Sequence, residues 1–460
     1  DTCPMMMTRL AWFTPLPPER SGISAYSAEL LPALAEEYSI DVFTESPSAC
    51  RPAGVDLLDA HDFVWKHQRH PYDLAVYQLG NATCHDYMWP YLFRFPGLVV
   101  LHDGQLHFAR ARLLQQQERC EDYRAEFTFN HPDVKAEVAD LGITGLLGSL
   151  HYFWPMLRTV VEASRCVAVH SHWLATDLRA EFPEATIANL CMGVPAGTPG
   201  ASPGTIRTRH AIPENAVVFA AFGRITPEKR ITQILQALAA IGEGETPIHL
   251  LLVGASAPYY DPVADARSLG VSDRVTLTGF VDEADLADYL ECADICLCLR
   301  WPSARETSAS WLRCLAAGKA TIVTDLVHTV QVPSLDPRSW KPQHAPAIGE
   351  GAPDGRPVEP ICVSLDILDE DHSLRLAMRR LAQDDALRSQ LGRQAYAYWQ
   401  RHHTLDRMVS DYQALLGRAL AIQPPAEDLP RHLRQDGLER ALTFAAEGGY
   451  PENPFDPRAR

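Results

Sequence analysis

Short apolar runs alternate with amphipathic helical patterns along most of the chain. The runs of the first half are "RLAWF" (9–13), "IDVFT" (40–44), "DLAVYQLG" (73–80), "LVVLH" (98–102), "CVAVHS" (166–171) and "IANL" (187–190). Those of the second half are "VVFAAFG" (217–223), "IHLLLVG" (248–254), "RVTLTGF" (274–280), "DICLCL" (294–299), "ATIV" (320–323) and "PICV" (360–363). Continuous apolar runs are typical of strands buried on both faces. Helical patterns between them predict parallel sheets covered by helices, an α/β fold.

A Pro-, Gly- and Ser-rich stretch divides this pattern into two halves. It reads "VPAGTPGASPGT" (194–205) and lacks periodicity, so we interpret it as a linker. With about six strands on each side, the sequence predicts two Rossmann-like, doubly wound domains, 1–197 and 198–387, facing each other across a cleft. Residues 388–421 are expected to be helical, and 422–460 to form a polar tail. Ligands bind such sheets beyond the carboxyl ends of the strands, so functional residues are expected in the turns there.

Composition narrows the class of protein. The 460 residues carry a formal net charge of −17, which argues against nucleic acid and anionic membranes as partners. No apolar run approaches the ~18 residues of a membrane-spanning helix, and no secretory signal is recognised. The eleven cysteines are scattered, and their odd number favours reduced thiols in a cytoplasmic protein. The closest group, Cys292, Cys296 and Cys298, lacks converging partners, so we expect no metal.

A basic turn follows the strand at 217–223. It reads "GRITPEKR", with Thr226 as a helix cap and Pro227 as a first helical position. This predicts Lys229 and Arg230 in the first turn of the following helix, where cations oppose the helix dipole unless an anion binds. Arg224 and Lys229 together indicate a diphosphate clamp. Two solvated surface cations are the alternative that the sequence leaves open.

Two turns of the first half also follow strands. Ser21 and Gly22 open a helix, and a glycine there lets backbone approach a ligand closely. His102 and Asp103 end a strand, and a histidine there is a candidate partner for a substrate hydroxyl. A purely structural helix start and a loop histidine bonded to backbone are the alternatives.

A single carboxylate, Glu306, lies in a turn between two apolar runs. The turn is rich in small residues that let backbone N–H groups approach a ligand, namely Ser303, Ala304, Thr307, Ser308, Ala309 and Ser310. A helix is expected to start near Ser310 or Trp311. The carboxylate can accept hydrogen bonds from polyol hydroxyls, while the N–H groups face a phosphate.

Taken together, these motifs resemble the retaining glycosyltransferases of the GT-B fold, family 4, the large "group 1" set. The resemblance extends from about Arg9 to about Ala421. In the second half it rests on "FGRITPEKR", "LLLVG", "VTLTGFVDEADLADYLECADICL" and "PSARETSASWLRCLAAGKATIVTD". In the first half it rests on "PLPPERSGISAYSAELLPAL", "LHDG" and "VHSHWLA".

The resemblance implies a role for each motif. Arg224 and Lys229 would neutralise the donor diphosphate in place of a metal, so no cofactor is expected. Glu306 would bind sugar hydroxyls as the first Glu of an E-x7-E pattern, and His102 would face the transferred sugar. The implied donor-binding residues are Gly22, Asp103, Phe280, Val281, Thr307, Ser308, Ala309, Ser310 and Arg313, with Phe280 and Val281 flanking the nucleobase. The last helices would cross back onto the first domain.

One residue departs from the family pattern. Counting back from Gly318, the second Glu of E-x7-E falls on Arg313, with one residue deleted between. The family's second Glu usually holds the ribose, and arginine cannot accept a hydrogen bond. Either the ribose is held otherwise or Arg313 contacts phosphate, which leaves the donor nucleotide open.

We therefore expect an enzyme: a metal-independent, retaining glycosyltransferase, of hexosyl groups, acting from a nucleotide sugar on a sugar or other small hydroxyl acceptor. The aromatic and His-rich segment 104–160 could shape the acceptor pocket, with ordinary helix packing as the alternative. Other readings are a glycosyl phosphorylase, an epimerase, or a nucleotide-sugar binder that has lost activity. The oligomeric state and the Pro-rich insert 328–359 stay open.

Overall fold

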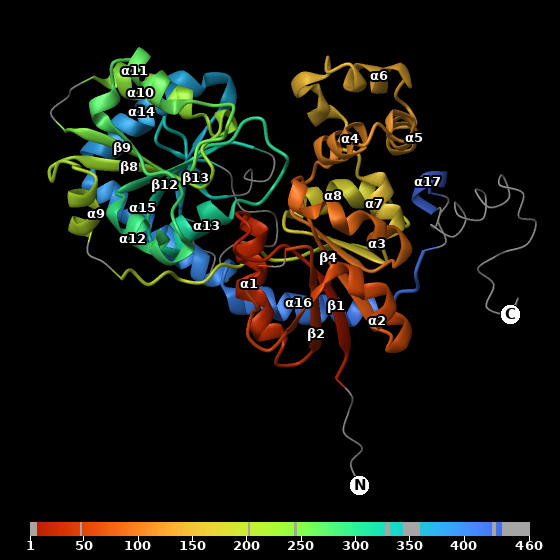
Figure 1. Ribbon diagram of the computed structural model, residues 1–460. Helices are drawn as coiled ribbons and strands as arrows, with labels where there is room; N and C mark the ends of the chain where they lie inside the picture. The colour runs from red at the N-terminus through yellow and green to blue at the C-terminus, as the bar shows by residue number, and fades with distance from the viewer. Residues whose placement is uncertain are drawn as a thin grey trace, which may run out of the picture.

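The chain folds into two α/β domains that lie side by side (Figure 1). The computed structural model describes residues 7–46, 48–200, 203–242, 246–326, 332–343, 359–425 and 429–434. Most of the Pro-rich insert at 328–359 and much of the polar tail fall outside these ranges. The linker leaves the first domain at its last strand and enters the second at α9 (Pro203–Arg209).

The first domain is built on a seven-stranded, fully parallel sheet of order β3-β2-β1-β4-β5-β6-β7. Its strands are β1 (Arg9–Phe13), β2 (Ser39–Thr44), β3 (Asp56–Asp59), β4 (Leu74–Leu79), β5 (Leu98–Leu101), β6 (Cys166–Val169) and β7 (Ile187–Asn189). Its helices are α1 (Gly22–Leu34), α2 (Phe63–Arg69), α3 (Trp89–Arg94), α4 (His107–Gln116), α5 (Cys120–Asn130), α6 (Glu137–Ile143), α7 (Arg158–Ala163) and α8 (His172–Glu181), with 3₁₀ turns η1 (Ala60–Asp62), η2 (Thr83–Met88) and η3 (Gly148–Phe153).

Both faces of this sheet are buried, as the continuous apolar strands predict. Side chains alternate between faces along a strand, so Leu10 and Trp12 of β1 pack under α1, whereas Ala11 and Phe13 pack toward α2 and α3. Helices α4 to α6 stand apart above the sheet edge (Figure 1). They have a small core of their own, made of Leu114, Tyr123, Phe127, Ala139 and Met156.

The second domain has an eight-stranded sheet of order β10-β9-β8-β11-β12-β15-β13-β14, parallel except for the last pair. Its strands are β8 (Val217–Phe222), β9 (Ile248–Val253), β10 (Val275–Leu277), β11 (Ile295–Cys298), β12 (Ala320–Thr324), β13 (Ser334–Leu335), β14 (Pro342–Gln343) and β15 (Cys362–Leu365). Its further helices are α10 (Ile231–Ile241), α11 (Pro262–Ser268), α12 (Leu286–Cys292), α13 (Ala309–Ala316) and α14 (Glu370–Gln383), with 3₁₀ turns η4 (Pro227–Lys229), η5 (Ser272–Arg274), η6 (Glu283–Asp285) and η8 (Ile367–Asp369).

The predicted α/β class with two doubly wound sheets is confirmed. Three strands are additional to those predicted. The edge strand β3 reads "DLLD", and the apolar pattern is too short there to predict a strand. Strands β13 and β14 have two residues each, fewer than a periodicity can define.

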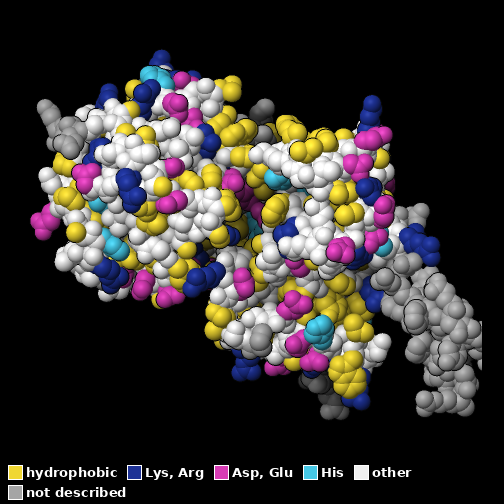
Figure 2. Space-filling view, turned by 45° about the horizontal axis from the view of Figure 1, so that its top comes forward, with side chains coloured by type: hydrophobic (Ala, Val, Ile, Leu, Met, Phe, Trp, Pro, Cys, Tyr) yellow, Lys and Arg dark blue, Asp and Glu magenta, His cyan; other side chains and the backbone are white. Residues whose placement is uncertain are grey.

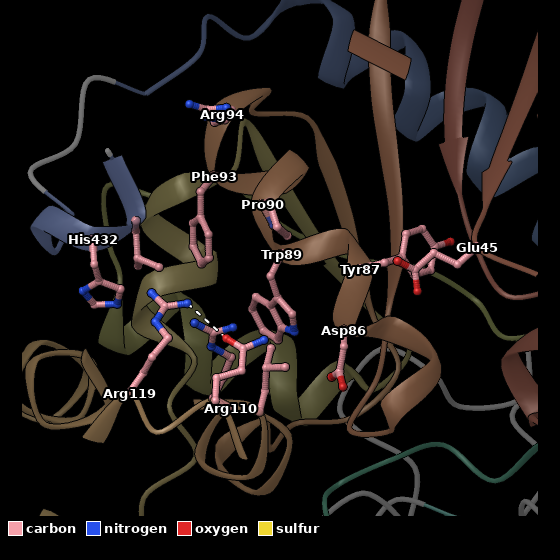
Figure 3. A pocket seen from close by; sticks show the side chains of 13 residues that line it. Glu45, Asp86, Tyr87, Trp89, Pro90, Phe93, Arg94, Arg110, Arg119 and His432 are labelled. Carbon is pink, nitrogen blue, oxygen red and sulfur yellow. Dashed lines mark hydrogen bonds between the residues drawn. The ribbon is translucent and has the colours of Figure 1, made fainter. Parts of the chain in front are cut away.

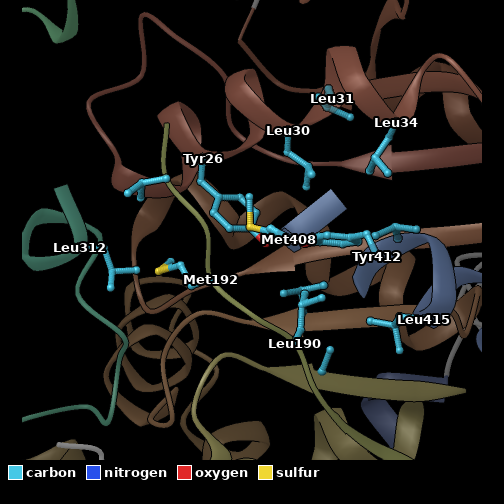
Figure 4. Packing of buried hydrophobic residues seen from close by; sticks show 14 of the residues in the cluster. Tyr26, Leu30, Leu31, Leu34, Leu190, Met192, Leu312, Met408, Tyr412 and Leu415 are labelled. Atoms are coloured by element: carbon cyan, nitrogen blue, oxygen red, sulfur yellow. Dashed lines mark hydrogen bonds between the residues drawn. The ribbon is translucent and has the colours of Figure 1, made fainter. Parts of the chain in front are cut away.

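Two long helices connect the domains again at the end of the chain. Helix α15 (Asp385–His402) packs on α13, and α16 (Leu405–Ala421) lies against α1 of the first domain (Figures 1 and 4). Tyr412 of α16 is fully buried, and its hydroxyl lies 2.6 Å from that of Tyr26. One apolar cluster therefore runs from α1 through α16 to Leu312 of the second domain.

No helix among the described residues is long and apolar enough to cross a membrane. The cysteines of the described ranges are all free thiols.

Candidate active site

The loops that follow β5 and β11 meet between the domains. Gly104 donates its backbone N–H to the carbonyl of Ala304 at 2.6 Å. Arg305 donates to the carbonyl of Gly104 at 3.3 Å and pairs with Asp177 of α8 at 3.2 Å. Arg305 has a φ of 59°, a left-handed conformation that is costly for a residue with a side chain. The carboxyl-edge turns of both sheets are thus held against each other.

Glu306 is held on both carboxylate oxygens. Its Oε1 lies 3.0 Å from Nε of Arg300, and its Oε2 accepts a hydrogen bond from Ser303 Oγ at 3.1 Å. Arg300 itself donates its backbone N–H to Thr324 Oγ1 at 3.0 Å. The strand end therefore orients the carboxylate that the sequence singled out.

Asp103 faces the same region from the first domain. Its Oδ2 accepts the backbone N–H of Asn81 at 2.7 Å. Burial, and next the negative charge of Glu306, raise the pKa of Asp103 to about 6. Two carboxyl groups from opposite domains are therefore close enough to influence each other. Asp103 is still mostly ionised at neutral pH, so it can accept hydrogen bonds from hydroxyls.

His102 lies beneath this pair in a polar, aromatic cluster. Its Nε2 is 2.8 Å from Gln78 Oε1, and its ring packs on Tyr26 and His170 with centroids 4.7 and 5.1 Å apart. Burial, and then His170, hold the pKa of His102 well below its usual range. The imidazole is neutral, and since the amide oxygen accepts from Nε2, Nδ1 is left as an acceptor.

Lys229 is partly buried at the end of β8. Its ammonium donates to the carbonyl of Phe222 and lies beside Gly223, where a Cβ would be 2.8 Å from Nζ and 3.5 Å from Ser310 Oγ. Burial, and then the charge of Arg300, lower the pKa of Lys229 to about 7. Within the described ranges no carboxylate forms an ion pair with it, so an anion could bind there.

A helical turn does start at Pro227 and contain Lys229, as predicted, but the prediction that Arg230 belongs to the same first turn was wrong, and Thr226 makes no side-chain cap bond. Residues Pro227–Lys229 form a 3₁₀ turn, Arg230 has a φ of 60°, and α10 starts only at Ile231. Arg230 turns away to Glu370, with its Nε 2.9 Å from the carboxylate. Arg224 lies exposed directly after Gly223.

Helix α13 begins beside Lys229, slightly earlier than expected. Ser308 is its N-cap and accepts the N–H of Trp311 at 3.2 Å, so Ala309 and Ser310 form the first turn and Thr307 precedes it. Trp311 Nε1 donates to Thr321 Oγ1 at 3.1 Å and fixes the helix on the sheet.

Arg313 contacts two carboxylates. Its Nη2 lies 2.6 Å from Glu29 Oε1 of α1 and 2.9 Å from Glu283 Oε1 of η6. Burial raises the pKa of Glu29, although Arg313 opposes this. Arg313, at the position where the resemblance predicts a second Glu, is therefore an interdomain ion-pair residue.

The remaining predicted residues line the same boundary. The ring of Phe280 is 46% exposed and carries the guanidinium of Arg20 at 4.0 Å from its centroid, whereas Val281 packs into the apolar cluster beneath. Gly22 is the first residue of α1, and a Cβ there would meet open space. The side chain of Ser21 caps the helix by accepting from Ile23 at 3.2 Å.

Sequence reasoning missed Arg300, Arg305, Glu29 and Arg20 as parts of this region. Arg300 and Arg305 carried a usable signal, because they flank Glu306 in the same turn. Glu29 and Arg20 carried none, since their partners are hundreds of residues away. Across the described residues, no three His, Cys, Asp or Glu side chains are grouped as a metal ion would require.

Comparisons with known proteins agree with this architecture. The family model of the glycosyl transferases group 1 matches residues 216–334, most of the second domain. The structure of sucrose-phosphate synthase from Thermosynechococcus elongatus aligns with a TM-score of 0.62 at 16% identity, over 90% of this chain and 99% of that one. WaaG, a glycosyltransferase involved in lipopolysaccharide biosynthesis, aligns with a TM-score of 0.58 at 14% identity, over 89% and 100%. The fold is that of the GT-B glycosyltransferases.

A third GT-B structure carries a ligand. Anabaena HepE in complex with UDP-glucose aligns with a TM-score of 0.54 at 12% identity, over 89% of this chain and 99% of that one. No curated protein matches the sequence. The predicted glycosyltransferase fold is confirmed, whereas family 4 and retention stay predictions.

This GT-B chain also has a cavity of about 480 Å³ on the side of the first domain away from the second (Figures 1 and 3). It is lined by α3 and α4, and α17 (Arg431–Arg434) forms one wall. Its charges are largely paired internally. Arg110 bonds to the buried Glu126 at 2.9 Å, and His432 reaches the same carboxylate at 2.9 Å. The cavity is therefore partly closed by α17, the last helix that the structure describes.

Proposed function

We propose that the protein transfers a hexosyl group from a nucleoside diphosphate sugar to the hydroxyl of an acceptor. The observation that carries the proposal is that Asp103 and Glu306 from opposite domains lie close together, near the ammonium of Lys229, with which no carboxylate of the described ranges forms an ion pair. A carboxyl pair suits sugar hydroxyls and a cation suits a diphosphate. Both lie at the carboxyl edges of the sheets, where ligands of such folds bind.

The basic and the acidic residues of the site would bind different parts of the donor. Lys229 and Arg224, with the first N–H groups of α13, would bind the diphosphate and stabilise negative charge as it leaves. Glu306 and Asp103 would hold sugar hydroxyls, and His102 would present Nδ1 to another. Phe280 would lie against the base, after Arg20 moves from its face.

We further propose that transfer occurs with retention and without a metal. The bond between the anomeric carbon and the diphosphate oxygen breaks, and the acceptor oxygen bonds the same carbon on the same face. The acceptor proton passes to an oxygen of the leaving phosphate. The family match and the cationic strand end support this scheme. On the free thiols and the sequence we propose a cytoplasmic location.

UDP is the first nucleotide to test, because HepE is titled as a complex with UDP-glucose. Thermal stabilisation by UDP, GDP, ADP, dTDP and their sugar conjugates should be measured without metal, for the wild type, Lys229→Ala and the exposed control Lys341→Ala. A ligand at 100 times its dissociation constant adds ~2.7 kcal/mol of stability.

We expect one nucleotide to stabilise the wild type and the control but not Lys229→Ala. Its sugar conjugate should then be turned over. If every nucleotide leaves the melting temperature of folded protein unchanged, the proposed function is wrong. Binding without turnover with any acceptor would favour a nucleotide-sugar binder, and turnover that depends on inorganic phosphate would favour a phosphorylase.

A further inference from the structure

Large apolar side chains are exposed together on one part of the first domain. Leu146 and Phe153 are 71% and 74% exposed. With Phe108, Leu141 and Leu150, which are also exposed, they form what we call the apolar surface. These five belong to α4, α6 and η3 or the turn between the last two, and Figure 2 shows apolar side chains over this part of the first domain.

This surface is not required by the packing of its own helices. The core of α4 to α6 is a separate set of fully buried residues, Leu114, Tyr123, Phe127, Ala139 and Met156. Exposed single apolar residues are common, but thirteen large apolar side chains are exposed in the described ranges and five fall within residues 108–153. Such a concentration is typical of a binding surface.

The apolar surface is connected to the candidate active site by hydrogen bonds. Asp103 accepts from Asn81, whose Nδ2 donates to Gln105 Oε1 at 2.8 Å. Gln105 Nε2 donates in turn to the carbonyl of His151 in η3 at 3.1 Å. The rings of Phe108 and His151 are 6.1 Å apart. The apolar surface therefore lies close to Asp103 of the candidate active site.

An aromatic residue of η3 also lies near the second domain. Tyr152 lies within the electrostatic reach of Glu228, Glu306 and Asp103. Trp301, which is 43% exposed, donates its backbone N–H to the carbonyl of Glu228 at 2.7 Å. Tyr152 of η3 therefore lies near the loop of the second domain that carries Trp301 and Glu306.

We infer that the acceptor is amphiphilic: the reacting hydroxyl belongs to a polar head that reaches Asp103, and an alkyl or aryl body covers the apolar surface. This rests on the proposed function. The hydrogen bonds through Gln105 and Asn81 connect this surface with Asp103, so its occupant is best joined to the substrate. An anionic membrane is disfavoured because the protein has a net charge of −17 and α5 and α6 begin with acidic residues.

The test uses the intact protein, its donor from the nucleotide screen, and methyl, butyl and octyl glycosides of a panel of sugars below their micelle concentrations. For an accepted sugar we expect KM to fall at least tenfold from methyl to octyl with kcat little changed, since each added CH₂ is buried. The variant Leu146→Ser/Phe153→Ser should lose most of this dependence. The control Leu368→Ser removes a side chain that is 92% exposed in the second domain and should keep it.

Equal KM values for methyl and octyl glycosides, or no transfer to any glycoside, would overturn the inference. Co-sedimentation with phosphatidylcholine vesicles that the double variant abolishes would overturn it in favour of a membrane surface. Failure of the proposed function is recognised separately, because nucleotide binding in the thermal screen involves no acceptor.

Discussion

Replacing Lys229 with methionine tests whether the site holds a destabilising charge for the sake of a ligand. Methionine keeps the length of the side chain and removes the ammonium. If the ammonium of Lys229 is destabilising until an anion binds, the variant should be more stable than the wild type without ligand. The variant should also no longer bind nucleotide. Such a gain of stability with a loss of function is expected where a site is built for binding.

The magnitude follows from the pKa. The ordinary value of 10.5 falls to about 7 in the folded protein. At ~1.36 kcal/mol per pKa unit, the charged form is destabilised by at most about 5 kcal/mol at pH 6. Partial exposure weakens this, and loss of the bond to the Phe222 carbonyl costs about 1 kcal/mol, so a net gain of about 1–3 kcal/mol is expected.

The sign of the pH dependence is fixed. Lys229 loses its proton at a lower pH in the folded state than in the unfolded state, so between about 7 and 10.5 the unfolded state binds more protons. The stability of the wild type relative to the variant should therefore rise with pH above about 7, by up to ~2.5 kcal/mol between pH 6 and pH 9. A bound diphosphate should raise the pKa of Lys229 again. Binding near pH 8 should therefore be accompanied by proton uptake at Lys229.

Urea unfolding at pH 6 and pH 9 and calorimetric titration with nucleoside diphosphate in two buffers measure these effects. The control is Lys341→Met, the same change at an exposed lysine, for which no gain is expected. A variant that is less stable than the wild type by the same amount at both pH values would refute the buried-charge argument. Unchanged nucleotide affinity in the variant would refute the clamp.

Three further predictions address the site and its support. Glu306→Gln should fold normally but lower kcat/KM about 10–100-fold, because a charged hydrogen bond to the sugar contributes ~1.5–3 kcal/mol; full activity would remove Glu306 from the site. Arg313→Glu should reduce unfolding stability by ~1–3 kcal/mol by opposing Glu29, and the exchanged pair Glu29→Arg/Arg313→Glu should recover part of it in a double-mutant cycle. Burial opposes ionisation of Glu126, yet Arg110 and His432 hold its pKa at about 2. The contribution of Glu126 to stability is therefore present above about pH 4.5 and is lost as the pH falls toward 2. Arg110→Ala should cost ~3–5 kcal/mol in urea unfolding at pH 7, and a loss under 1 kcal/mol would show that the pair is not truly buried.

The fold was predictable because its cause is local. A strand such as β8, with six buried residues, shows its double burial as an unbroken apolar run. Elements that are stabilised mainly by neighbouring strands could not be predicted from the sequence. Strand β3 is held at the sheet edge by pairing with β2, and two-residue pairings such as β13 with β14 have no periodicity.

Those residues of the candidate site that directly follow a strand could be predicted from the sequence. Glu306, Asp103 and Lys229 each follow a strand, and parallel strands bring such turns to one edge. The path of the backbone after β8 was not predictable, because Thr226 and Pro227 are common to an α-helical and a 3₁₀ start. Arg230, which ends the 3₁₀ turn, is held by a bond to Glu370, 140 residues away, and no local sequence pattern shows this partner.

Arg313 marks the limit of motif reasoning most clearly. The resemblance predicts a carboxylate at this position, and an opposite charge in a predicted binding site suggests lost function. The structure supplies the reason that sequence spacing could not: Glu29, 284 residues away, lies 2.6 Å from its guanidinium, and Glu283 completes the neutralisation. A partly buried arginine between two carboxylates is stabilised as long as both remain, so restoring Glu at this position alone would crowd three negative charges together. Arg313 therefore forms a unit with Glu29 that joins the domains, and a variant at position 313 is best interpreted together with the matching variant at Glu29.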